Sequence, residues 1–176
     1  MRSKIVKIFS LVVVIVMVAT TSAHAYSLTG WYLYYKTAYF KWGDYIQTSG
    51  STVRNAWEDA IDDWNDACSA NFYYSSGAIS ELNSMHDDND ELLGWTYTQP
   101  NTDGSVAYFF GYLNAWSPYI GQTNVARSSA NHELGHVLGL DELYSGRAIM
   151  NLHRDRTSIY LPQTDDLNGI AAIYGD

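Results

Sequence analysis

The hydrophobic positions of this chain follow a helical period in one long segment and gather into short aromatic runs elsewhere. The helical segment begins after Ser51, a good N-cap residue. Its apolar side chains recur every three or four positions, at Val53, Trp57, Ala60, Ile61, Trp64 and Cys68. Acidic residues lie between them, which predicts an amphipathic helix of about four turns with its aromatic stripe in the core. Four runs rich in Tyr, Phe and Trp predict β-strands, at Tyr32–Lys41, Asn71–Ser75, Leu92–Thr98 and Val106–Leu113.

Two more helices are predicted in the last third of the chain. Residues Asn124–Asn131 lead into a helical segment whose inward side chains are Val137, Leu138 and Leu140. Further on, Thr164 or Asp165 is a suitable N-cap for a last helix. The packing face of that helix consists of Leu167, Ile170, Ala171, Ile173 and Tyr174. Strands and helices in this order predict a small α/β domain.

The first 25 residues have the composition of a secretory signal peptide. Three basic residues surround the start of an apolar run, its uncharged core is Ile8–Ala19, and Ala23-His24-Ala25 offers an A-x-A cleavage site. The alternative is an uncleaved membrane anchor, but this core is shorter than the ~20 residues that a membrane span needs. We therefore expect secretion and cleavage before Tyr26, which leaves residues 26–176 as a single domain.

Charge and cysteine content narrow the classes of partner. The signal segment holds three of the ten Lys and Arg and none of the 19 Asp and Glu, so residues 26–176 have a net charge of −12. This acidic balance argues against nucleic acid and anionic membranes as partners.

Cys68 is the one cysteine in the sequence, so no disulfide can form within the chain. We expect the protein to be a monomer.

The strongest chemical pattern is N-H-E-L-G-H-V-L-G-L-D-E, at Asn131–Glu142. His132 and His136 are four residues apart, so on a helix both imidazoles project from one face, where a single Zn²⁺ can bind both. Glu133 follows the first histidine and could act as general base towards a zinc-bound water. A bare H-E-x-x-H motif is a modest signal, because short motifs arise by chance.

Gly139 makes the pattern more specific, because a residue without a Cβ can turn the chain sharply at the helix end. With this glycine the sequence resembles the metzincin metallopeptidases, whose pattern is H-E-x-x-H-x-x-G-x-x-H followed by a Met-turn. Ala148-Ile149-Met150 resembles the Met-turn, and residues 165–170 through Tyr174-Gly175 resemble the closing helix of the matrixin branch.

The resemblance to matrixins implies both a fold and an activity. The fold would be α/β (α+β), with a twisted, mostly parallel sheet, an antiparallel edge strand, an active-site helix and a C-terminal helix. The activity would be that of a zinc endopeptidase. In this family, the methionine corresponding to Met150 lies beneath the metal site as a hydrophobic base and does not bind the metal.

The third zinc ligand departs from the family pattern. Glu142 stands where the pattern has its third histidine, and two histidines with one carboxylate form a known catalytic set. Asp141 is one residue early and would need a different turn. His153, three residues past Met150, is a rival nitrogen donor. We prefer Glu142, then Asp141, then His153.

The resemblance also predicts where other ligands would bind. Structural Ca²⁺ is common in matrixins, and the acidic stretch Glu81–Glu91 could hold it, although its spacing fits no EF-hand and a solvated loop is preferred. A polypeptide substrate would add as an extended strand to an exposed sheet edge, for which Ala107–Asn114 is the candidate. Asn151–Tyr160 would form one wall of the pocket for the side chain after the scissile bond.

We therefore expect a secreted zinc-dependent endopeptidase. His132, His136 and Glu142 would hold Zn²⁺, and Glu133 would be the catalytic base. The alternative is a non-catalytic exported binding protein that kept the scaffold after losing a ligand. The missing third histidine favours this alternative, whereas the presence of Glu133 argues against it, since a binding protein does not need that residue.

Overall fold

The computed structural model describes residues 26–46 and 51–175, so the predicted signal peptide at 1–25 lies outside the described residues. Within them the elements are β1 (Ser27–Leu28), η1 (Tyr34–Lys36), β2 (Thr37–Trp42), α1 (Thr52–Ala67), β3 (Asn71–Tyr74), β4 (Glu81–Met85), β5 (Gly94–Pro100), β6 (Val106–Asn114), η2 (Pro118–Gly121), α2 (Thr123–Val137), β7 (Leu140–Asp141) and α3 (Thr164–Tyr174). None of the described helices has the length and apolar composition needed to cross a membrane.

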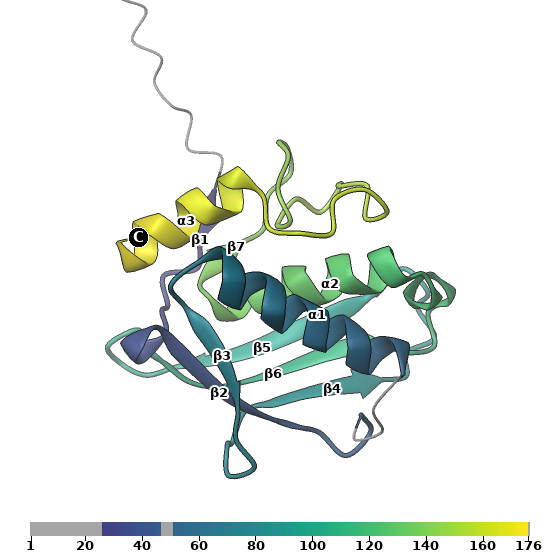
Figure 1. Cartoon of the computed structure of the whole chain (residues 1–176), viewed down its shortest axis with the longest axis horizontal. Coiled ribbons are helices and arrows are strands. Elements are labelled where there is room, and N and C mark those ends of the chain that lie inside the picture. The colour runs from purple at the N-terminus through teal and green to yellow at the C-terminus, as the bar shows by residue number, and fades with distance from the viewer. Residues whose placement is uncertain (1–25, 47–50, 176) are drawn as a thin grey trace, which may run out of the picture.

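Five strands form a twisted sheet in the order β3-β2-β4-β6-β5 (Figure 1). β2, β3, β4 and β6 run parallel to one another, and β5 pairs antiparallel with β6 at one edge. This arrangement confirms the predicted mostly parallel sheet with an antiparallel edge strand. The parallel strands need long crossover connections, and α1 provides one of them between β2 and β3.

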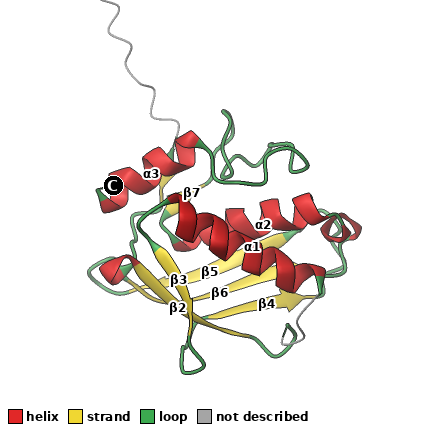
Figure 2. Ribbon diagram, in the orientation of Figure 1, coloured by secondary structure: helices red, strands yellow, loops and turns green. Residues whose placement is uncertain are grey.

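Helices α1 and α2 lie side by side over one face of the sheet, and α3 lies apart from them near the short strands β1 and β7 (Figure 2). In α1 the predicted aromatic stripe is confirmed, because Trp57 and Trp64 are both 0 % exposed. Each indole N–H donates a 3.0 Å hydrogen bond to a backbone carbonyl, that of Asn83 in β4 and that of Asn131 in α2. The two tryptophans therefore fix α1 against both the sheet and α2.

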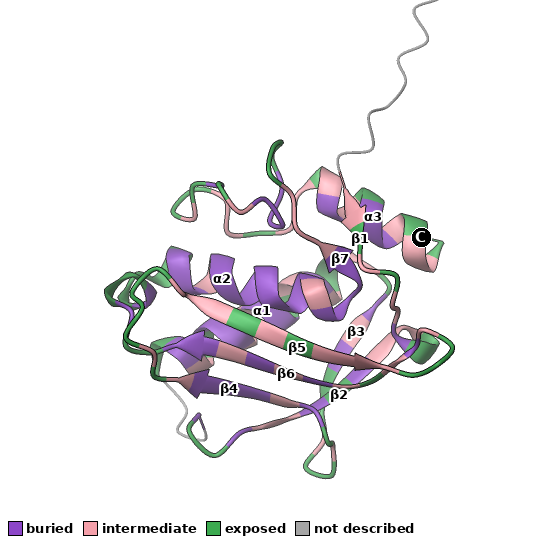
Figure 3. Cartoon of the chain, turned by 180° about the vertical axis from the view of Figure 1, so that it is seen from behind, coloured by how far each residue is buried: buried purple, intermediate pink, exposed green. Residues whose placement is uncertain are grey.

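The free edge of the sheet nearest α2 is β5, whereas the sequence analysis assigned the edge to Ala107–Asn114. That segment falls in β6, which pairs with β4 on one side and β5 on the other, so the prediction was wrong. The hairpin between Pro100 and Val106 places β5 outside β6, and the parallel partner β4 occupies the inner side. Figure 3 shows β5 running along α2 at this edge of the sheet.

The stretch Glu81–Glu91 is not one acidic loop but a strand followed by a shorter loop. β4 occupies its first half and lies between β2 and β6. The strand is hard to recognise from its sequence because it buries polar side chains: Asn83 is 6 % exposed and Ser84 is 8 % exposed. Leu82 is its one fully buried apolar residue, so the usual apolar enrichment of a buried strand is absent.

Two element boundaries also differ from the prediction. The strand expected at Tyr32–Lys41 begins at Thr37, because the preceding residues form a 3₁₀ turn in which Tyr35 has a positive φ of 55°. The last helix is capped by Gln163 rather than by Thr164 or Asp165. A capping box forms there with Asp166, whose carboxylate accepts from the backbone N–H of Gln163.

Candidate metal centre

Helix α2 presents the two motif histidines from its buried side. Most of the helix is covered by α1, β5, β6 and the loops around it, and His132 is only 5 % exposed. The rings of His132 and His136 meet edge to face with their centroids 4.8 Å apart, as expected for residues one turn apart on one helical face. The sequence prediction that both imidazoles share one face is confirmed.

Backbone carbonyls orient both imidazoles. His132 Nδ1 lies 2.9 Å from the carbonyl oxygen of Ile149, and His136 Nδ1 lies 3.0 Å from that of Leu140. Because a carbonyl oxygen can only accept, Nδ1 of His136 carries the proton of its bond, and the Nε2 atoms of both rings face Glu142. Partners of this kind set the ring orientation of histidines that bind metals.

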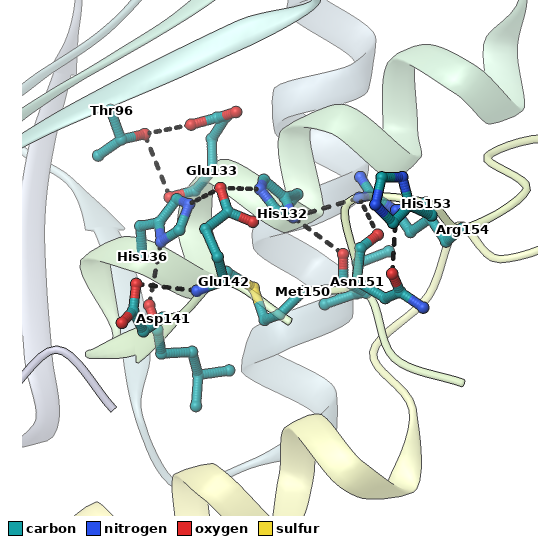
Figure 4. A network of polar contacts seen from close by, with 12 residues as sticks. Thr96, His132, Glu133, His136, Asp141, Glu142, Met150, Asn151, His153 and Arg154 are labelled. Carbon is teal, nitrogen blue, oxygen red and sulfur yellow. Dashed lines mark hydrogen bonds and ion pairs between the residues drawn. The ribbon is translucent and has the colours of Figure 1, made fainter. Parts of the chain in front are cut away.

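The turn after α2 brings a carboxylate to these two nitrogens (Figure 4). Gly139 has a φ of 99°, and a Cβ there would collide with the carbonyl oxygen of Trp31, so this position requires glycine. Beyond it the chain forms β7 and returns Glu142 to the helix. Glu142 Oε1 lies 3.3 Å from His132 Nε2 and 3.4 Å from His136 Nε2.

The donor set of this cluster fits a tetrahedral zinc ion. Its three ligand atoms lie within 4.8 Å of one another, and no other cluster of three such side chains forms among residues 26–46 and 51–175. Ligands about 2.1 Å from a tetrahedral centre are about 3.4 Å apart, which matches the distances around Glu142. The second oxygen of Glu142, Oε2, is buried and has no hydrogen-bond partner, so it too is available to a cation.

Protonation of the cluster follows from the closeness of its members. Burial opposes ionisation of Glu142, but hydrogen bonds with His132 and His136 outweigh it and lower the pKa of this carboxyl to about 2. Burial likewise opposes a charge on His136, yet the hydrogen bond with Glu142 and the charge of Glu133 raise the pKa of this imidazole. The site thus stabilises an anionic carboxylate with positive charge beside it, and a bound cation would take the place of that positive charge by displacing the imidazole proton.

The two rival ligands lie outside the cluster. The carboxylate of Asp141 accepts a 2.9 Å hydrogen bond from the backbone N–H of Glu142 and points away from the histidine nitrogens. His153 is exposed, its ring lies beside that of Tyr144, and it does not belong to the cluster. Of the three candidates from the sequence, the structure brings only Glu142 to the histidines.

Glu133 lies next to the cluster without belonging to it. Its side chain is 6 % exposed and points towards β5, where the hydroxyl of Thr96 donates a 2.9 Å hydrogen bond to Oε2. Thr96 was not identified from the sequence, because nothing in a strand pattern indicates which residue will face the next helix. The carboxylate of Glu133 is therefore held between the edge strand and the histidines.

Comparison with known proteins agrees with this architecture. The family model for matrixin matches residues 35–175, a range that includes every residue of the cluster. The chain belongs to the matrixin family. Matrixins are metallopeptidases that use zinc, so the family implies zinc as the metal for this cluster. A search of curated proteins gave no match to the sequence.

The Met-turn of this matrixin packs directly beneath the histidines. Met150 is 1 % exposed, and its sulfur contacts α2 at Gly135, where a Cβ would collide with it. The turn is held by Asp166 in α3, whose carboxylate accepts from the backbone N–H groups of Ile149 at 2.7 Å and Met150 at 3.2 Å. Asp166 was expected only as part of the closing helix, and its role depends on a contact that the sequence does not reveal.

We predict that Asp166→Ala lowers the free energy of unfolding by roughly 3–5 kcal/mol, because three backbone N–H groups would lose a buried acceptor. Asp165→Ala is the matched control, since Asp165 contributes mainly to the helix dipole and should cost under about 1 kcal/mol. Urea unfolding followed by circular dichroism measures both. Equal stabilities of the two variants would show that Asp166 does not anchor the Met-turn.

A buried arginine next to the cluster is the main feature that sequence analysis missed. Arg154 is 5 % exposed, and Nη1 lies 3.2 Å from Nδ1 of His132. Burial lowers the pKa of this guanidinium to about 9, so it stays charged at neutral pH. Arg154 lies four residues after Met150, in the segment that was expected to form a pocket wall. That position was the only indication in the sequence that this arginine would lie near the site.

The loop that was predicted as a possible calcium site is held by hydrogen bonds within the protein. The carboxylate of Asp87 accepts from the backbone N–H of Asn89, and Asn114 bonds the backbone at both Asp87 and Asn89. These bonds stabilise the loop as a set of turns. Calcium binding by this matrixin stays a prediction.

Proposed function

We propose that this matrixin is a secreted zinc endopeptidase in which His132, His136 and Glu142 hold the metal. The observation that carries the proposal is the convergence of the two Nε2 atoms on one carboxylate oxygen of Glu142, at 3.3 and 3.4 Å, with Glu133 held beside them. The apolar signal segment before Tyr26 supports secretion.

Zinc bound there would polarise the substrate carbonyl and make an adjacent water more acidic. Glu133 would accept the proton of the attacking water and later pass it to the amine of the leaving peptide. Thr96 orients this carboxylate by donating to Oε2, so that the other oxygen, Oε1, remains available for the proton. Asp166 holds the Met-turn in place, and Met150 packs that turn against α2 beneath the site.

The substrate would bind as an extended strand along β5. No described strand pairs with the outer edge of β5, and Thr96 connects this strand to Glu133. An added peptide would form main-chain hydrogen bonds with that edge and bring one of its peptide bonds to the catalytic carboxylate. β5 thus takes the role that the sequence analysis gave to Ala107–Asn114.

The competing function is that of an exported binding protein without catalysis. Its support was the absence of a third histidine, and the position of Glu142 weakens it, because a carboxylate occupies the place of the third ligand. The buried Glu133 weakens it further, because an acidic side chain excluded from the cluster adds nothing to metal retention.

The test is to purify residues 26–176, measure zinc by mass spectrometry and follow cleavage of casein. The proposal predicts one zinc per chain and cleavage that a chelator abolishes and added zinc restores. Folded protein that contains no zinc and leaves casein intact would favour the binding protein and refute the peptidase.

A further inference from the structure

A cavity of about 450 Å³ lies beside the metal cluster. It is open to solvent and is lined by the residues just before β5, by η2, by the first turn of α2 and by the segment after the Met-turn. Leu93, Tyr119 and Val125 provide apolar walls, and Arg154 and Arg156 provide two cations. Because Arg154 also touches the ring of His132, the cavity and the cluster share a wall.

The direction of a bound peptide determines which substrate residue meets this cavity. β5 runs from Gly94 to Pro100, and Thr96 marks the level of Glu133. Antiparallel pairing is the more stable kind, so we expect the substrate to run from the Pro100 end towards the Gly94 end. The residue after the scissile bond would then leave Glu133 in the direction of Leu93, where the cavity lies.

Arg154 is locked in place within the cavity wall. Its Nε and Nη2 donate to the hydroxyl and carbonyl of Ser128 at 2.9 Å, and Nη1 donates to the carbonyl of Asn151 at 3.0 Å. These bonds use three of the five N–H groups of a guanidinium. All three acceptors are neutral, and no carboxylate among the described residues forms an ion pair with it.

Arg156 is partly buried, and its hydrogen-bonding capacity is used even less than that of Arg154. Its Nε is buried without a hydrogen-bond partner, and it too lacks an ion pair among the described residues. Two acids lie at the cavity, Glu91 and Asp155, and both are exposed. Asp155 already accepts from Thr157 and Ser158. A buried donor without an acceptor is costly, so an incoming anion would gain more here than at the surface.

We propose that this cavity receives the side chain that follows the scissile bond and that Arg154 and Arg156 make it selective for an acidic residue. The inference rests on the peptidase function proposed above. The apolar walls would contact the methylene groups of a glutamate, and its carboxylate would accept from the guanidinium of Arg156. Residues 26–176 carry a net charge of −12, which repels anionic peptides at long range, so a preference for acid must arise locally.

The test compares two fluorogenic peptides that differ only by Glu or Gln directly after the scissile bond, with the cleaved bond identified by mass spectrometry. For the zinc-loaded wild type we expect kcat/KM to be on the order of tenfold or more higher for the Glu peptide. In Arg156→Gln the ratio should fall to within about twofold of unity. Because each ratio compares two substrates on one enzyme sample, a lower folded fraction does not change it.

Arg147→Gln is the matched control, because it removes the same charge from an exposed arginine that bonds Gln163 outside the cavity. It should keep the wild-type ratio. Equal cleavage of the two peptides by the wild type would overturn the proposal, and so would a ratio that Arg156→Gln leaves unchanged or that both variants lower equally. If the wild type cleaves neither peptide nor casein, the proposed peptidase function itself fails, so the two failures are distinguishable.

Discussion

Glu133→Gln is expected to lower kcat/KM for peptide hydrolysis by roughly 10²- to 10⁴-fold, which is the usual contribution of a positioned general base. The amide is nearly isosteric with the carboxylate and can still accept from Thr96, so the surrounding structure should persist. Glu133 lies outside the cluster of metal-binding side chains, and the variant should therefore keep its zinc. Initial rates on one peptide, together with zinc content, measure both effects.

Glu58→Gln provides the control for this change. Glu58 lies on the outer face of α1 with its side chain 45 % exposed, and its pair with Arg54 contributes little at the surface. This variant should match the wild type in rate and zinc content. A Glu133→Gln enzyme as active as Glu58→Gln would mean that another group accepts the proton.

The second large effect is expected on metal affinity. Glu142→Ala removes one of three ligand atoms, so zinc affinity should fall by more than about a hundredfold, beyond the loss seen when a supporting hydrogen bond is removed. Peptidase activity should disappear with the metal. Competition with a chromophoric chelator measures the affinity, and circular dichroism checks that the variant is folded.

Asp141→Asn distinguishes Glu142 from its neighbour. Asp141 Oδ1 accepts from the backbone N–H of Glu142, and the amide oxygen of asparagine can do the same, so zinc affinity should stay within about tenfold of the wild type. If Asp141→Asn lost its zinc while Glu142→Ala retained it, the third ligand would be Asp141 and the turn would differ from the one described.

The sequence predicted the parts of the site that depend on local geometry. His132, Glu133 and His136 lie within one turn of a helix, so their spacing determines their relative positions. Gly139 was expected to turn the chain, and its φ of 99° confirms that expectation. The placement of Glu142 follows from this turn within a few residues.

Strand order and long-range anchoring could not be predicted in the same way. β5 and β6 have similar aromatic sequences, and only the pairing of β6 with β4 decides which of them is the edge. Asp166 reaches the Met-turn from a helix 16 residues away, and charged residues early in a helix are usually interpreted as capping or solvated groups.

Arg154 and Arg156 illustrate the same limit. In a loop sequence, arginines suggest solvent exposure, and the burial of Arg154 results from the way the segment after Met150 folds back on Ser128. A pocket wall was expected at Asn151–Tyr160, so the segment itself was predicted. The positive charge that its arginines bring to the pocket was not.

The most direct test of the metal centre is a crystal structure of zinc-loaded residues 26–176 with anomalous diffraction measured at the zinc edge. We expect one anomalous peak, about 2.0–2.2 Å from Nε2 of His132, Nε2 of His136 and a carboxylate oxygen of Glu142. A peak coordinated by Asp141 or His153 in place of Glu142, or no peak at the histidines, would contradict the proposed site.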